Sequence, residues 1–410
     1  MNSNLIRALA ASTIATAAAL AAPAAAAKAG DPVAIGDGVT LDPIIDGLLR
    51  YEHVAQDNAL KDADALTLRI RAGVELKAGA FALLAEANGN LALVDNYNDT
   101  VPGNGVEPYS VVADPDDVDL NRLQVQYTSK PATVTLGRQR INLDDQRFVG
   151  AVGWRQNEQT FDAVRGEFKV GPVALDATYA LAQNTVFGFE SPNKRFKGDF
   201  VFLDGGLDVK IAKVKAFAYL LDYDDRAAFS SQTYGLLASG SLPLGDAFKV
   251  SFLASYAHQS DYQANPVDYS ADYLHGEFGA SVAGFGLTAG YEELGSDGGV
   301  AAFQTPLATL HKFNGFADLF LTTPATGLRD YYGGIGKGLG DVGPLKGLKA
   351  GVTYHEFDSD FGGIDYGSEW DAVLSFKVGN YAVLLKYANY DAKDFAVDTE
   401  KFWLQFGFSY

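Results

Sequence analysis

Runs in which apolar and polar residues alternate recur along almost the whole chain, and this pattern constrains the fold more than any other feature. Between Leu66 and Lys77, for example, the even positions are apolar, whereas the odd positions carry polar, charged or glycine residues, among them Arg69 and Arg71. Successive side chains of a β-strand point to opposite faces, so such a run predicts a strand with one apolar and one polar face. A helix would distribute both kinds of residue around its circumference.

Eighteen segments show this alternation and are the expected strands. An even number fits a closed sheet, in which no strand edge is left unpaired. The weakest alternation is found in 43–53, 131–141 and 327–337, so the expected number is about eighteen. The expected strands are 43–53, 65–77, 80–94, 117–129, 131–141, 161–170, 173–183, 198–211, 213–223, 231–243, 247–260, 271–282, 285–292, 327–337, 345–357, 366–378, 380–390 and 399–410.

The connections between these segments are alternately very short and long. Short turns at one end and long loops at the other are typical of outer-membrane barrels, whose strands of about 10 residues cross the bilayer. We therefore predict an all-β fold, a transmembrane antiparallel β-barrel of about 18 strands with short periplasmic turns and long extracellular loops. A soluble β-sandwich or propeller is the alternative, and its apolar face would point into a core. The short connections are 78–79, 130, 171–172, 212, 283–284 and 379, and the long ones are 95–116, 142–160, 184–197, 261–270 and 293–326.

The first 27 residues differ from the rest of the chain. Arg7 precedes an alanine-rich apolar stretch, which closes with the small-residue pattern Ala25-Ala26-Ala27. This arrangement predicts a secretory signal peptide over 1–27, with an N-terminal membrane anchor as the alternative. Residues 28–42 are then expected to form a periplasmic N-terminal segment, and 43–410 the barrel. After residue 27 no run of 18 apolar residues remains, so no membrane-spanning helix is expected.

Composition excludes several classes of function. The chain contains no cysteine, which rules out a disulfide framework and any zinc or iron–sulfur site with cysteine ligands. Its net charge of −19 argues against nucleic acid as a partner, since neutralising phosphates needs a basic face. None of the five histidines lies in an H-E-x-x-H motif or near a G-x-S-x-G motif. We therefore expect neither an enzyme nor a cofactor or metal site.

The C-terminus provides independent support for a barrel. From Phe402 to Tyr410 apolar positions alternate with polar ones, and the chain ends on an aromatic residue. This ending resembles the signal that the barrel-assembly machinery reads in Gram-negative outer-membrane proteins. We therefore expect the outer membrane as the location, and the assembly machinery, membrane lipid and lipopolysaccharide as partners.

Arginine is concentrated in one part of the chain. Nine of the thirteen arginines lie between Arg50 and Arg165. The polar faces of the strands should line a water-filled interior, where always-charged guanidinium groups would favour anions, carboxylated sugars in particular. The predicted pore-lining and substrate-binding residues are Arg69, Arg71, Arg122, Arg138, Arg140 and Arg165. The alternative is that the arginines stiffen the wall by pairing with Glu52, Glu75, Asp144, Asp145, Asp162 and Glu167.

The loop after the fifth expected strand is a candidate constriction. Alternation breaks at Gly137, which indicates a β-bulge near the rim of the barrel. The following loop carries Arg147, Trp154 and Arg155 and is long enough to fold into the pore. An aromatic ring beside arginines suits stacking on sugars. A solvent-facing loop is the alternative.

Two stretches around this loop resemble the alginate export family of outer-membrane porins. They are Gly137-Arg138-Gln139 and Phe161-Asp162-Ala163-Val164-Arg165, and the similarity covers about 120–170. Elsewhere it depends on the strand pattern and the C-terminal aromatics. The resemblance implies an 18-stranded barrel with an arginine-lined, electropositive pore for polyuronates such as alginate, with Arg138 and Arg165 in the lumen. A general carbohydrate or small-solute porin, and a structural or adhesion barrel without transport, are the alternatives.

Overall fold

The computed structural model describes residues 31–245 and 248–409, and in these residues β-strands make up nearly all of the regular structure. The predicted signal peptide lies outside the described residues. The strands are β1 Val33–Gly36, β2 Val39–Gln56, β3 Ala63–Ala78, β4 Phe81–Asn96, β5 Asp117–Thr128, β6 Ala132–Gln139, β7 Thr160–Val170, β8 Val173–Asn184, β9 Arg195–Val209, β10 Ala212–Tyr223, β11 Ser231–Pro243, β12 Phe248–Asp261, β13 Ser270–Val282, β14 Phe285–Leu294, β15 Leu328–Val342, β16 Leu345–Asp358, β17 Asp365–Val378, β18 Tyr381–Ala392 and β19 Thr399–Ser409. Two 3-10 turns, η1 Ala227–Phe229 and η2 Leu310–Lys312, lie in loops.

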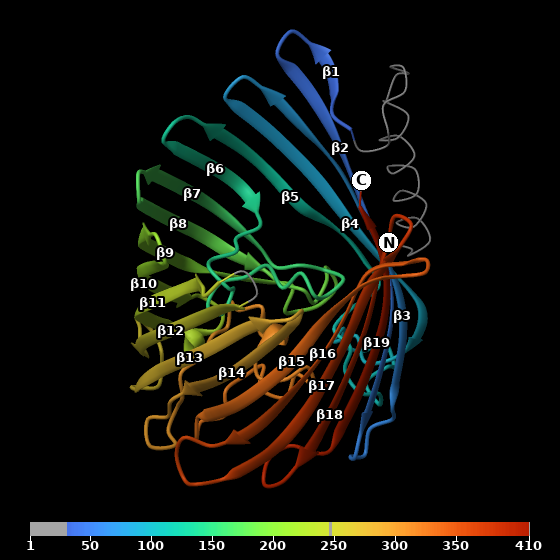
Figure 1. The fold of residues 1–410 in the computed structure, drawn as a ribbon, viewed down its shortest axis with the longest axis vertical. Coiled ribbons are helices and arrows are strands. Elements are labelled where there is room, and N and C mark those ends of the chain that lie inside the picture. Colours follow the sequence, from blue (N-terminus) through green and yellow to red (C-terminus); the bar gives the residue numbers. More distant parts are fainter. Residues whose placement is uncertain (1–30, 246–247, 410) are drawn as a thin grey trace.

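Strands β2 to β19 form a closed antiparallel barrel (Figure 1). Each pairs with its neighbours in the sequence, and β19 pairs back with β2 from Thr399 opposite Gln56 to Ser409 opposite Asp46. Closure gives the backbone amides of both terminal strands partners, which a bilayer cannot supply. The predicted barrel of about 18 strands is therefore confirmed.

The short strand β1 is an addition that the sequence pattern did not indicate. It pairs with the start of β2, with Val33 opposite Leu41. Pairing between β19 and β2 ends at Asp46, so β1 covers part of the β2 edge that β19 leaves free. Strand pairing thus begins inside the expected N-terminal segment 28–42. Four residues are too few for alternation to be visible in the sequence.

Short turns lie at one end of the barrel and long loops at the other, as the connection lengths predicted. Between β3 and β4, and between β17 and β18, the turn contains a glycine with φ of 58°, Gly79 and Gly379 respectively. This backbone conformation favours residues without a Cβ atom. The long loops include 97–116, 140–159 and 295–327.

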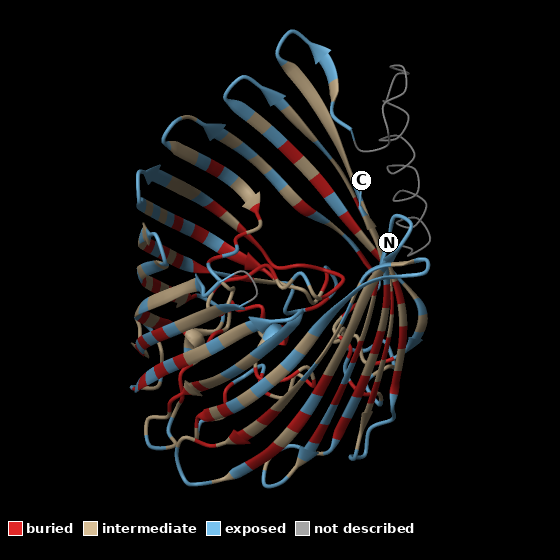
Figure 2. Ribbon diagram, viewed as in Figure 1, coloured by how far each residue is buried: buried red, intermediate tan, exposed pale blue. Residues whose placement is uncertain are grey.

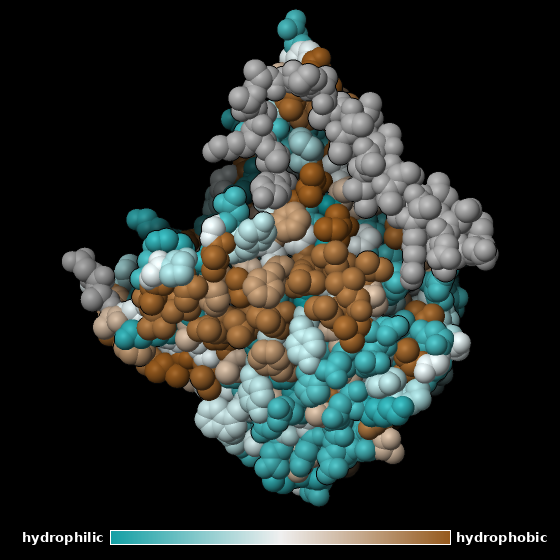
Figure 3. Space-filling view, turned by 90° about the vertical axis from the view of Figure 1, so that its right-hand side faces the viewer, coloured by the Kyte–Doolittle hydropathy of each residue, from teal (hydrophilic) through white to brown (hydrophobic). Residues whose placement is uncertain are grey.

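Apolar side chains face outward along the strands, and polar ones face inward. On β5, for example, Leu123, Val125 and Tyr127 are exposed on the outer face, while Gln124 and Gln126 face the interior beside them. Figure 2 shows this alternation along the strands, and Figure 3 shows a broad band of apolar residues on the outer surface with a hydrophilic zone below it. An apolar band around a polar interior matches a barrel that sits in a membrane. Within the described residues, no helix has the length and apolar character needed to cross a membrane.

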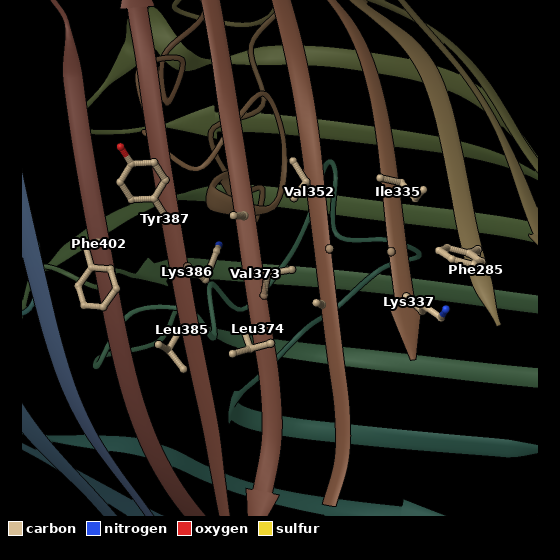
Figure 4. A pocket seen from close by; sticks show the side chains of 14 residues that line it. Phe285, Ile335, Lys337, Val352, Val373, Leu374, Leu385, Lys386, Tyr387 and Phe402 are labelled. Atoms are coloured by element: carbon tan, nitrogen blue, oxygen red, sulfur yellow. The ribbon is translucent and has the colours of Figure 1, made fainter. Parts of the chain in front are cut away.

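A shallow depression of about 430 Å³ interrupts the outer face between β14 and β19 (Figure 4). The large side chains of Phe285, Ile335 and Tyr387 border it, whereas Ala350 and Ala372 form part of its floor. Because small residues replace large ones here, the outer wall is locally thin.

Two loops fold into the barrel and fill its middle. The loop 140–159 between β6 and β7 and the loop 295–327 between β14 and β15 contact each other through a bridge between Val149 and Leu307. Phe148 packs on inward-facing rings of the wall, with its ring centroid 4.9 Å from that of Phe217. The buried hydrophobic residues thus lie inside the barrel around these loops (Figure 2). The interior is therefore narrowed by protein, with an aromatic core on one side.

Candidate functional site

The inner wall carries arginines that are each paired with a carboxylate. Arg122 lies opposite Glu86 on the neighbouring strand and donates two hydrogen bonds to it, of 2.9 and 2.7 Å. Arg165 donates to Asp176 at 2.9 Å, across β7 and β8. Side chains that face each other across an antiparallel pair are close enough to bond directly. The wall at these positions therefore presents both charges to the lumen.

The other predicted pore-lining arginines near the loop 140–159 follow the same rule. Arg71 forms an ion pair of 3.2 Å with Glu158 of that loop. Arg140 also pairs with Glu158, and Arg69 pairs with Asp46 on β2. Arg140 is the most open of the three, with a third of its side chain exposed. These arginines are thus paired within the wall, as the stiffening interpretation expects, but their partners Asp46, Glu86 and Glu158 are not among the carboxylates it named.

Arg138 lies on the outer face of the barrel, which corrects the expectation that it lines the pore. It is opposite Leu123 on β5 and Asp162 on β7, and Leu123 is exposed on the outer face. Cross-strand partners share a face, so Arg138 points outward as well. It forms an ion pair of 2.8 Å with Asp162, which also pairs with Arg195. The expectation came from the family resemblance, whereas the pairing of β6 continues without a register shift at Gly137 and keeps Arg138 on the same outer face as the exposed Leu136.

Arg147 anchors the loop 140–159 to the opposite wall. Its guanidinium, buried to 98 %, donates to Glu292 on β14 at 2.6 Å and to Thr305 and Asn314 of the loop 295–327 at 2.9 and 3.2 Å. Burial opposes its charged form, but the ion pair with Glu292 outweighs this and raises the pKa of Arg147 above its ordinary value. Arg147 therefore holds the two loops and the wall together, because protein groups accept all its strong hydrogen bonds.

Arg155 anchors the same loop on the other side, where the barrel closes. It donates to Glu52 on β2 at 3.2 Å and to Asp318 of the loop 295–327 at 3.1 Å. Asp318 also contacts His311 at 2.8 Å and Lys401 at 3.6 Å. Despite burial, which acts in the opposite direction, these cationic and hydrogen-bonding partners hold the pKa of Asp318 far below its usual range. Asp318 is thus the common acceptor at this contact.

Trp154 lies at the centre of the contact between the loops and the wall. Its ring stacks on that of His311 with centroids 4.1 Å apart, and the charged groups of Arg50 and Lys386 lie 4.3 Å from its centroid. Burial lowers the pKa of His311 to about 3, so the ring is neutral near pH 7. Its Nδ1–H then donates to Asp318, and its Nε2 accepts from Lys386 at 2.6 Å. Arg147, Trp154 and Arg155 are therefore all brought inside the barrel.

Two cavities flank the inward-folded loops. One, of about 480 Å³, lies toward the long-loop end and is lined by Arg155, Arg226 and several apolar side chains. The other, of about 570 Å³, lies below the loop 295–327 against β13 to β17. Glu277, Asp330 and Asp371 contribute carboxylates to its lining. Space for solutes thus exists on both sides of the loops.

The carboxylates of this lower cavity were missed by the sequence reasoning. Glu277, Asp330 and Asp371 lie on the inner faces of β13, β15 and β17, and Asp330 accepts a hydrogen bond of 2.9 Å from His355. Alternation already places Asp371 on the polar face of its strand, but it does not show that these three carboxylates meet in one cavity. The far wall of the barrel is therefore acidic as well as poor in arginine.

Comparison with known proteins agrees with this architecture. Residues 46–236 match the family model of alginate export, while no curated protein sequence matches the chain. The crystal structures of Pseudomonas aeruginosa OccK9 (OpdG) and OpdO are similar, each with a TM-score of 0.69 and 14% identity over 90% of this chain and 99% and 97% of theirs. That of Acinetobacter baumannii OccAB3 has a TM-score of 0.66 and 14% identity over 90% of this chain and 100% of its own. At this identity the structural likeness shows the fold, which is that of outer-membrane porins, and the model of the alginate export family matches residues 46–236, a little under half of the chain.

Proposed function

We propose that the protein is a passive diffusion channel for small polar solutes in the outer membrane of a Gram-negative bacterium. The observation that carries this proposal is the pair of cavities, of about 480 and 570 Å³, on either side of loops that narrow a closed barrel. A membrane barrel with a polar interior offers water-soluble molecules a path that the lipid denies them. The porin fold of the similar structures supports a channel rather than an enzyme or a purely structural barrel.

Anionic solutes, uronate oligosaccharides among them, are the first candidate class. The family match supports them, and so do two exposed lysines toward the short-turn end of the barrel, Lys349 and Lys377. Neither ammonium group has a carboxylate within 4.0 Å among the described residues. The arginines of the wall contribute less, because their carboxylate partners compensate their charge. We therefore expect a modest preference for anions.

Uncharged carbohydrates are the second candidate class, favoured by the lower cavity. Its lining combines carboxylates and histidines such as His275 and His355 with the rings of Phe313 and Tyr332. Carboxylate oxygens accept hydrogen bonds from hydroxyl groups, but they repel other carboxylates. A sugar without a carboxylate would suit such a surface.

Reversal potentials in planar bilayers, measured across a potassium chloride gradient, test the first class. We expect discrete channels with anion preference, and a shift toward cations in the double variant Lys349→Gln, Lys377→Gln. The control variant Arg138→Gln removes a positive charge from the outer face, so its selectivity should equal that of the wild type. Cation preference of the wild type would contradict the anionic class, and absence of any conductance would contradict the channel itself. Swelling of proteoliposomes in glucose, faster than in glucuronate, would favour the second class.

A further inference from the structure

The cavity at the long-loop end has a lining that is mostly apolar, which a path for polar sugars does not need. Five loops and the adjoining strand ends contribute to its volume of about 480 Å³. Rings and aliphatic side chains occupy much of its surface, namely Phe187, Phe196, Phe229, Leu310, Leu319 and Leu321. Surfaces of this kind gain free energy by covering an apolar molecule.

One charged group in this lining lacks a partner. Arg226 precedes η1, and its guanidinium carbon lies 4.4 Å from the ring centroid of Phe196 and 4.1 Å from that of Phe229. Every other arginine within the described parts of the chain has a carboxylate within 4.0 Å. Arg226 has none among those residues, nor does its guanidinium donate a hydrogen bond to any of them. Its donors are therefore available to a molecule in the cavity.

The two phenyl rings restrict where the guanidinium can point. A planar guanidinium held over aromatic faces is preorganised, and its parallel N–H groups match the two oxygens of a carboxylate. Half-burial beside rings also weakens its contact with water, and this burial lowers the pKa of Arg226 from its ordinary value. Water would therefore compete less with a carboxylate for binding to this guanidinium than it would at an exposed arginine.

The other charged groups of the cavity are already engaged with one another. Arg155 and Lys401 both pair with Asp318, and His311 donates to the same carboxylate. They leave Arg226 as the unpaired cation of the lining within the described residues. The cavity thus combines one available anion-binding group with an apolar surface.

We propose that this cavity is an entry site for small monocarboxylates with an apolar, preferably aromatic, body, in which the carboxylate binds Arg226 and the body packs against Phe196, Phe229 and the neighbouring leucines. The inference rests on the proposed channel and names a solute class for its outer mouth. A polyuronate fits less well, because its many hydroxyl groups would lose water against the apolar lining without gaining partners.

Isothermal titration of the detergent-solubilised protein tests this site with three named probes. Benzoate combines a carboxylate with an apolar ring, benzyl alcohol keeps the ring without the charge, and glucuronate keeps the charge on a polar body. We expect benzoate to bind at least about tenfold more tightly than either of the others, since a charge-assisted pair and the apolar contact each contribute about a factor of ten or more. Equal binding of benzyl alcohol, or tighter binding of glucuronate, would overturn the proposal.

Variants of two neighbouring cations assign the effect to Arg226. Arg226→Gln should weaken benzoate binding by about tenfold or more, and Arg226→Lys should restore part of it, because lysine keeps the charge without the planar fork. Lys194→Gln is the matched control, since Lys194 is exposed on an adjacent loop with its ammonium 4.2 Å from the ring centroid of Phe189 and outside the cavity lining. Unchanged benzoate affinity in folded Arg226→Gln would refute the site.

Conductance distinguishes failure of this site from failure of the channel. If the protein opens channels but benzoate ignores Arg226, only the entry site is refuted. If benzoate binding depends on Arg226 while no conductance is seen, the site stands and the channel function is refuted.

Discussion

Removing the Arg147 side chain should release the loop 140–159 from the wall. In Arg147→Ala, Glu292 stays buried with hydrogen bonds from Tyr273 and Asn314 but without its cation. Leaving one charge of a buried pair without its partner typically costs about 3–5 kcal/mol. The lower value changes an equilibrium constant by about 150-fold, because each 1.4 kcal/mol corresponds to a factor of ten. The loop 140–159, which undocks from the wall rarely in the wild type, would then undock often.

Single-channel recording in planar bilayers measures this release directly. We expect larger mean conductance and frequent current fluctuations in Arg147→Ala. Arg140→Gln serves as the control on the same loop, because Arg140 is a third exposed and its partner Glu158 keeps the ion pair with Arg71. The double variant Arg147→Met, Glu292→Met removes the orphaned charge as well and should return toward quiet, low conductance. Wild-type conductance and noise in Arg147→Ala would refute the anchoring role.

Three further predictions follow from single positions. As the pH falls below about 6.5, a histidine in an undocked loop takes up a proton, whereas the docked His311 stays neutral until about pH 3. Docking of the loop 295–327 should therefore weaken by about 1.4 kcal/mol per pH unit in that range, and channel noise should rise. The variant His311→Gln should flatten this dependence of channel noise on pH. Asp318→Asn should destabilise docking of the loop 295–327 at pH 7, since Arg155, His311 and Lys401 lose their common carboxylate. Faster proteolysis of this loop in the variant would show the effect, whereas protection equal to that of the wild type would count against this role. Gly137→Ala should lower barrel stability in a urea titration by about 1–3 kcal/mol, because φ of 118° disfavours a side chain and a Cβ atom would lie 2.3 Å from the carbonyl oxygen of Leu123; an unchanged midpoint would contradict this strain.

The strands could be predicted from the sequence because their signal is local. Each alternating segment, such as 65–77, reports its own two faces without any knowledge of its neighbours, and the structure places a strand, Ala63–Ala78, over that segment. The interior position of Arg165 followed from the same parity. β1 was missed because it is too short to alternate.

The contacts of the site could not be predicted, since they join segments far apart in the chain. Nothing in the alternation around Arg147 indicates that Glu292 is its partner, 145 residues later. The family resemblance placed Arg138 in the lumen, although its parity with the exposed Leu136 puts it on the outer face. Parity therefore predicts the face of a side chain within its strand, and partners only between adjacent strands.

The bridge between Val149 and Leu307, together with the ion pair from Arg147 to Glu292, connects strands that are widely separated around the circumference. This connection across the interior resists flattening of the barrel, because any change in the shape of the barrel must stretch or compress it. The cross-section of the barrel and the width of its aperture are thus mechanically linked, and lateral pressure in the surrounding bilayer acts on both at once.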